Sequence, residues 1–242
     1  MAESFSRRYV RHFTTLTEQD QQRLHSSKIC QLGLGGLGGT LLEMLARMGF
    51  GRRGEGWIRT ADGDVFEDSN LNRQLFCLES NIGRPKAEGA MTRIEAVNSD
   101  IDLTARQTVV MPDEMPGFIQ GADIVLDALG DLPSKLALRR AAAAAGLPVV
   151  SAGVAGWTGF ITTHLPNDMY SDIFQGVLAQ GEGAEVSLGT LAPCVWLIAA
   201  LQCREAVALA CGHPPLFHGS LHIVDLTDAG WERIMLMPES AE

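Results

Sequence analysis

A glycine-rich run, GLGGLG at residues 33–38, constrains this chain more than any other feature of its sequence. It follows a short apolar segment at 28–34 and precedes apolar residues at helical spacing in 40–48. Glycines let a backbone turn sharply beside a phosphate, and the following helix offers free amide hydrogens at its N-terminus. The order of strand, G-x-G-x-x-G and helix therefore predicts a nucleotide-binding loop. A tight turn without a ligand is the alternative interpretation.

Strand and helix patterns then alternate along the first 152 residues. Apolar runs predict strands at 57–60, 103–110, 124–129 and 148–152, and periodic segments predict helices at 86–97 and 136–145. Closer runs at 159–165, 221–226 and 232–237 indicate antiparallel strands. We therefore expect an α/β fold with a Rossmann-like, doubly wound, mostly parallel sheet that is extended by C-terminal antiparallel strands.

The length of 242 residues fits a single domain. We divide it into an N-terminal helical region at 1–27, a nucleotide-binding half at 28–152 and a partner-binding, sheet-extending half at 153–242. The glycine-rich stretch 175–189 predicts a mobile loop. Residues 191–211 are the most apolar, but Arg204 and Glu205 interrupt them, which indicates a buried helix rather than a membrane span.

Charge and cysteine content exclude several classes of protein. With 19 basic and 29 acidic residues the net charge is −10, which argues against general nucleic-acid binding. No signal peptide or membrane span is evident, so we expect a cytoplasmic protein. The cysteines form no C-x-x-C pair, so we expect neither a disulfide framework nor structural zinc. The histidines at 213, 218 and 222 lack metal-site spacing and predict a solvent-exposed turn.

Polar and cationic residues follow the second predicted strand. Asp62 stands where an acidic side chain accepts ribose hydroxyls, and Asp64 follows it. Asn70 and Arg73 come next, and Lys86 begins a predicted helix. A guanidinium fork and a lysine point charge suit a polyphosphate, so the cluster favours phosphoryl or nucleotidyl transfer. A nicotinamide-dependent oxidoreductase remains the second class, although it gives these cations no shared role.

An ordered set of motifs resembles the ThiF/MoeB/HesA family of adenylating enzymes, relatives of the ubiquitin-activating enzymes. The set comprises RYVR at 8–11, GLGGLG, D-x-D at 62–64, SNLNRQ at 69–74, GRPKAE at 83–88 and GTLAPCVWLIAALQCREAVALACG at 189–212. No single motif is decisive, but their order is specific and covers nearly the whole chain.

The resemblance implies an enzyme that binds ATP and magnesium. It would activate the C-terminal carboxylate of a small ubiquitin-fold sulfur carrier ending in Gly-Gly as an acyl-adenylate. The positions that would line the nucleotide are Gly35, Gly36, Gly38, Asp62, Asp64, Asn70 and Gln74. Arg73 and Lys86 would contact phosphates and stabilise developing charge. Arg11 matches an arginine that reaches into the neighbouring site of a homodimer.

The chain departs from the family at the metal position. The family pattern is Asp-x-x-Asp-Asn, and the second aspartate binds magnesium. Here the run from Asp127 is DALGD, so Gly130 replaces that aspartate and Asp131 follows it. We expect Asp131 to hold the metal through a one-residue shift. A magnesium-deficient, noncatalytic scaffold is the alternative. Cys194, near the late helix, is expected to be a buried apolar residue rather than a nucleophile.

Overall fold

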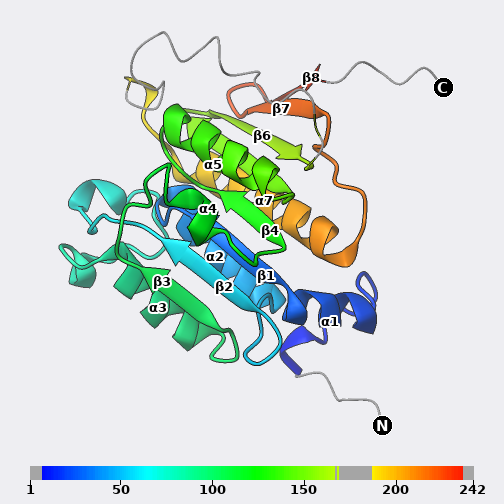
Figure 1. Ribbon diagram of the computed structural model, residues 1–242. Helices are drawn as coiled ribbons and strands as arrows, with labels where there is room; N and C mark the ends of the chain where they lie inside the picture. Colours follow the sequence, from blue (N-terminus) through cyan, green and yellow to red (C-terminus); the bar gives the residue numbers. More distant parts are fainter. Residues whose placement is uncertain (1–6, 167, 169–186, 237–242) are drawn as a thin grey trace.

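A computed structural model describes residues 7–166, 168 and 187–236 (Figure 1). One eight-stranded sheet has the order β3-β2-β1-β4-β5-β6-β7-β8. The strands are β1 Lys28–Leu32, β2 Trp57–Ala61, β3 Leu103–Arg106, β4 Ile124–Asp127, β5 Val149–Ala155, β6 Thr158–His164, β7 Ser220–Asp225 and β8 Gly230–Met235. Strands β1 to β5 pair in parallel, and the pairs β5–β6, β6–β7 and β7–β8 are antiparallel. The expected fold class is therefore confirmed.

Helices cover both faces of this sheet, as the apolar pattern of its strands requires. Short 3-10 turns are η1 Arg7–Tyr9, η2 Asp68–Asn70 and η3 Glu79–Asn81, and the helices are α1 Glu18–Ser26, α2 Gly36–Met48, α3 Lys86–Val97, α4 Met115–Phe118, α5 Leu132–Ala144 and α7 Ala192–Cys211. One core cluster joins α2, α3 and α7 to the sheet. A second, smaller cluster joins α4 and α5 to the other face. The sheet is thus doubly wound.

Helix α7 is the late apolar helix, and it belongs to the core. By length and composition α7 alone, among the described residues, could cross a membrane, but 56% of its apolar window is buried inside the protein. It approaches β6 so closely that a Cβ built at Gly159 would collide with Ile198. The expectation of a buried helix at 191–211 is confirmed, and Cys194 is buried within it.

Several boundaries differ from the sequence prediction for local reasons. Helix α5 begins at Leu132, four residues earlier than expected, because the Asp131 side chain caps it and a proline occupies its first turn. Strand β3 ends at Arg106 rather than at residue 110. Of the expected loop at 175–189, the part up to residue 186 lies outside the described residues.

Candidate active site

The glycine loop joins β1 to α2 at the carboxyl edge of the parallel strands, where ligands of doubly wound folds bind. Gly33 has φ +96°, and a Cβ there would collide with the carbonyl of Ala128, at the end of β4. A Cβ at Gly38 would collide with the carbonyl of Gly33. Glycine is therefore required at both positions, and the loop lies tightly against its own helix and the neighbouring strand.

A buried glutamine holds this loop from inside. The Gln31 side-chain amide donates to the carbonyl oxygens of Gly33 at 3.0 Å and Gly38 at 2.9 Å. Gln31 is fully buried in β1. Sequence reasoning passed over it, although a polar residue within an apolar strand was the available signal.

Asp62 connects the second strand to the loop. Its carboxylate accepts the backbone amide of Leu34 at 2.7 Å and that of Asp64 at 2.9 Å. The acidic residue after β2 is therefore placed beside the glycine loop, as the sequence indicated. The contacts fix its position at the loop, where the ribose was expected.

Lys86 lies beside the same strand end. Its ammonium donates to the Asp64 carboxylate at 2.8 Å, and the Lys86 backbone amide donates to the carbonyl of Asp64 at 3.0 Å. The two side chains differ in exposure, because 7% of Lys86 and 70% of Asp64 is accessible. The ammonium therefore lies in a mostly buried position with a carboxylate partner that water can solvate.

Arg73 and Gln74 lie against the glycines themselves. A Cβ at Gly36 would lie 3.4 Å from Cγ of Arg73, and a Cβ at Gly35 would lie 3.9 Å from Nε2 of Gln74. Asn70 is buried just before them, and its side-chain oxygen Oδ1 accepts the backbone amide of Glu67 at 3.2 Å. Asn70 therefore shapes the turn that presents Arg73.

The start of α7 completes this neighbourhood, which the sequence did not foretell. A Cβ at Gly36 would lie 3.0 Å from Cγ1 of Val195. The indole nitrogen of Trp196 donates to the carbonyl of Arg73 at 3.3 Å. The antiparallel half of the chain thus supplies one wall of the glycine loop.

The expected metal residue, Asp131, caps helix α5. Its Oδ1 accepts the backbone amide of Ser134 at 2.8 Å, whereas Oδ2 has no partner among the described residues. No described atom outside its chain neighbours lies within 4 Å of a Cβ built at Gly130. Magnesium is commonly held by one or two carboxylates together with substrate phosphates. The donor set fits such an ion through one oxygen of Asp131, and Gly130 contributes none.

Asp127 is committed elsewhere. Its carboxylate accepts the Lys135 ammonium at 3.2 and 3.3 Å and the Ser151 hydroxyl. Asp127 and Lys135 are both buried, and the lysine also donates to the carbonyl of Ala152 at 2.6 Å. This carboxylate is therefore a structural anchor.

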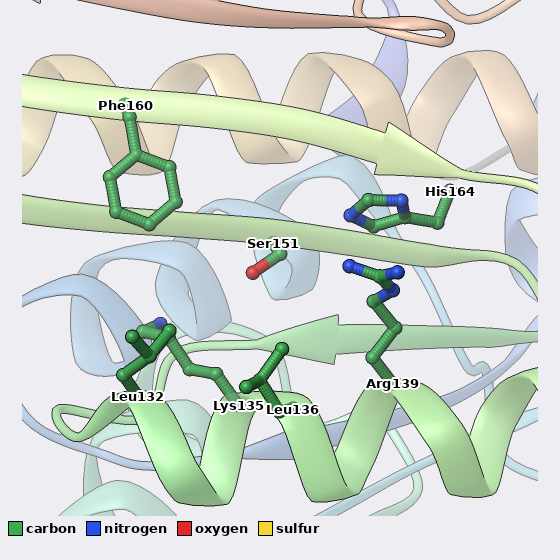
Figure 2. A pocket seen from close by; sticks show the side chains of 7 residues that line it. All are labelled: Leu132, Lys135, Leu136, Arg139, Ser151, Phe160 and His164. Atoms are coloured by element: carbon green, nitrogen blue, oxygen red, sulfur yellow. The ribbon is translucent and has the colours of Figure 1, made fainter. Parts of the chain in front are cut away.

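A small cavity of about 10 Å³ lies beside that anchor, between α5 and strands β5 and β6 (Figure 2). Lys135, Arg139, Ser151, Phe160 and His164 are among its lining residues. Burial, with the Arg139 charge adding to it, lowers the pKa of His164 to about 3. None of the residues expected to bind ATP lines this cavity, although its lining residue Leu132 directly follows Asp131.

Arg11 is not brought to the glycine loop of its own chain. The preceding Tyr9 packs against Gly49, which ends α2, whereas the glycine loop begins that helix. A helix of 13 residues is about 20 Å long. Arg11 is exposed, which leaves it accessible to a second copy of the chain.

Among the described residues, the cysteines and histidines bring together few potential metal ligands. All five cysteines are free and buried. His222 is buried in β7, where its Nδ1 accepts the indole of Trp231 at 2.8 Å, so the expected solvent-exposed turn is wrong for this residue. Within the described ranges, Asp20, Cys211 and His213 alone bring three potential metal ligands within 4.8 Å. The Arg23 guanidinium lies 3.6 Å from the same oxygen of Asp20 that faces His213, and it opposes a cation there.

Comparison with known proteins defines the class. The model of the ThiF family matches residues 6–242. The SAMP-activating enzyme E1 of Haloferax volcanii is 28% identical over 94% of this chain and 84% of its own length. The sulfur carrier protein ThiS adenylyltransferase of Escherichia coli is 28% identical over 89% and 84%, respectively. The molybdopterin-synthase adenylyltransferase of the same organism is 26% identical over 90% and 86%.

Solved structures agree on the fold. A crystal structure of Escherichia coli MccB with succinimide superposes with a TM-score of 0.80 at 19% identity, covering 96% of this chain and 72% of that one. The chain belongs to the ThiF family. The expected enzyme class, adenylyltransferase, is confirmed by the relatives that bear this name.

Proposed function

We propose that this chain is an ATP-dependent adenylyltransferase that activates the C-terminal carboxylate of a small ubiquitin-fold sulfur carrier ending in Gly-Gly. One observation carries the proposal: Arg73 lies against the glycine loop, and Lys86 is joined to the same loop through Asp64 and Asp62, at the carboxyl edge of the parallel strands. Two anions must meet in such a reaction, and fixed cations with backbone amides reduce their repulsion.

In this mechanism a carboxylate oxygen of the carrier attacks the α-phosphorus of ATP. A new bond forms between that oxygen and phosphorus, the bond to the bridging oxygen breaks, and pyrophosphate leaves. The amides at the start of α2 bind phosphate oxygens, and Asp62 orients the ribose beside Leu34. Asp64 is well exposed, so Lys86 can exchange this carboxylate for a phosphate at low cost.

Asp131 would hold the magnesium ion through the oxygen that does not cap α5. The ion would supply charge neutralisation on the triphosphate. If Asp131 has this role, Asp131→Ala should require far more magnesium for the same rate. An unchanged magnesium dependence would show that another group, or none, holds the metal. Absence of exchange by the wild type would instead favour the noncatalytic scaffold as the consequence of Gly130.

The carrier and the oligomeric state follow from the same reasoning. The relatives' names include activation of SAMP and adenylylation of ThiS, which supports a small protein substrate. Arg11 is remote from the glycine loop of its own chain. This supports a homodimer in which Arg11 of each copy reaches the nucleotide site of the other copy. We place the reaction in the cytoplasm.

The test is ATP–pyrophosphate exchange with a small Gly-Gly protein that co-purifies with the enzyme. The wild type should catalyse exchange and leave an adenylate mass on that protein. Arg73→Ala and Lys86→Ala should each lower exchange by about 10²–10³-fold while circular dichroism stays unchanged. Normal exchange in both variants would reject the site. If NAD rather than ATP protects the folded protein, an oxidoreductase would be favoured.

A further inference from the structure

The side chain of Asn72 joins two segments that the proposed function uses separately. Its amide oxygen accepts the Arg73 guanidinium at 2.8 Å. Its amide nitrogen donates to the carbonyl of Thr190 at 3.1 Å, across 118 positions of sequence. An asparagine amide has both a donor and an acceptor, so one side chain makes both contacts.

The guanidinium of Arg73 is held by only one of its nitrogens. Nη1 donates to the carbonyl of Ser69 at 2.9 Å as well as to Asn72, and these two bonds use both of its hydrogens. Among the residues that the structure describes, Nε and Nη2 have no hydrogen-bond acceptor. The bonds of Nη1 therefore set the orientation of the plane, and the opposite edge is available to a phosphate oxygen.

The other end of the connection is anchored in the antiparallel half. The Gly156 amide, at the turn between β5 and β6, donates to the carbonyl of Gly189 at 2.7 Å. Leu191 then occupies the N-cap position of α7, and its carbonyl accepts the amide of Val195, the residue that faces Gly36. Thr190 is thus fixed between the sheet extension and the helix that walls the glycine loop.

We propose that Asn72 is a positioning residue that aims Arg73 and couples it to the Gly189–Leu191 segment. This inference rests on the proposed function, because it assigns Arg73 to a phosphate of ATP. When a phosphate binds the Nε and Nη2 edge of Arg73, the guanidinium keeps its hydrogen bond to Asn72. Asn72, through its own bond to the carbonyl of Thr190, then restrains Thr190. Occupancy of the nucleotide site is thereby transmitted to the half of the chain that we expect to receive the carrier.

Two consequences distinguish this role from general support of the fold. Asn72→Ala should weaken ATP binding by about tenfold, the scale of one charge-assisted hydrogen bond. Its effect should vanish in an Arg73→Ala background, since Asn72 acts through that residue. In addition, ATP should slow hydrogen exchange in a peptide covering residues 187–191 of the wild type, and this protection should be lost in Asn72→Ala.

Asn81 supplies a matched control. Its side-chain amide also bridges two backbone groups, accepting the amide of Leu78 at 2.8 Å and donating to the carbonyl of Phe76 at 2.8 Å. Neither contact involves Arg73 or Thr190. Asn81→Ala should therefore leave the coupling between the nucleotide and residues 187–191 intact, and its effect on ATP affinity should be the same with or without Arg73.

The experiment titrates ATP with magnesium chloride into the wild type, Asn72→Ala, Arg73→Ala, the double variant and Asn81→Ala by calorimetry, and follows hydrogen exchange with and without ATP. Equal ATP affinity in Arg73→Ala and the double variant, with lost protection in Asn72→Ala, supports the inference. Additive effects, or protection that persists in Asn72→Ala, overturn it while the proposed function stands. Absence of ATP binding by the wild type overturns both.

Discussion

Two lysine–aspartate pairs at the same edge of the sheet have the same chemistry and opposite uses. In the Lys86–Asp64 pair the carboxylate is 70% accessible, whereas in the Lys135–Asp127 pair both side chains are 8% accessible or less. Water can solvate Asp64 when its lysine turns to another anion. Asp127 has no such alternative, because a buried charge without a partner is costly. Exposure of the carboxylate, rather than the ion pair itself, separates a cation available to a ligand from a cation fixed in the core.

The comparison is tested most severely by Lys135→Met, which keeps the length of the side chain and removes its charge. We expect a loss of about 3–5 kcal/mol in the free energy of unfolding, because Asp127 remains buried without its ammonium. Urea unfolding followed by circular dichroism measures the change. Adding Asp127→Asn should recover part of the loss, and a loss below about 1 kcal/mol in the single variant would contradict the assignment of an anchor.

The same substitution at the exposed pair should have the opposite profile. Lys86→Met should lower ATP–pyrophosphate exchange by about 10²–10³-fold, since one charge on the transition state is lost. Its free energy of unfolding should change by less than about 1 kcal/mol, because Asp64 returns to water. A large loss of stability with normal exchange would reverse the roles of the two lysines.

Acid should lower the free energy of unfolding through His164, which lines the cavity beside the buried Lys135–Asp127 pair. Burial lowers its pKa in the folded state to about 3, so the unfolded chain, with a pKa near 6.5, binds more protons between these values. The contribution of neutral His164 to the free energy of unfolding is therefore complete above pH 6.5 and is lost as the pH falls toward 3. Between pH 7 and pH 5 the loss is about 2 kcal/mol. Unfolding of His164→Leu should show a smaller decrease over that range, and equal decreases would exclude this residue as the cause.

The smallest effect is expected for Asp64→Asn. An ion pair with so exposed a carboxylate contributes about 1 kcal/mol or less, so stability should barely change. ATP affinity, measured by calorimetry, should stay the same or rise slightly because Lys86 no longer has a competing anion. A clear decrease in affinity would show that Asp64 itself binds the nucleotide, as the resemblance to the family implies.

The sequence predicted the fold because its periodic signals are local. The glycine loop and the helix that begins at Lys86 are each recognisable from a pattern of a few residues. The resemblance to the family assigned Arg73 and Asp62 to the candidate site. Contacts between distant segments were beyond such reasoning. The bond from Asn72 to Thr190 spans 118 positions, and the wall that Val195 provides depends on how α7 returns over α2.

The metal position shows a different limit. The pattern identified Asp131 as the available carboxylate, but it did not reveal that one oxygen of this residue caps α5. A cap depends on where the helix begins, and the predicted start at residue 136 was four residues late. Boundaries of helices are weakly encoded, so functions that depend on a cap need the structure.

The bonds from Gln31 to both ends of the glycine loop have a consequence for affinity. Because that amide lies in the interior, the loop acquires its shape as the protein folds rather than when a nucleotide arrives. The entropy of immobilising this backbone is then absent from the binding equilibrium. The nucleotide binds a loop that is already ordered. The free energy of its phosphate contacts is therefore not reduced by the entropic cost of ordering the loop.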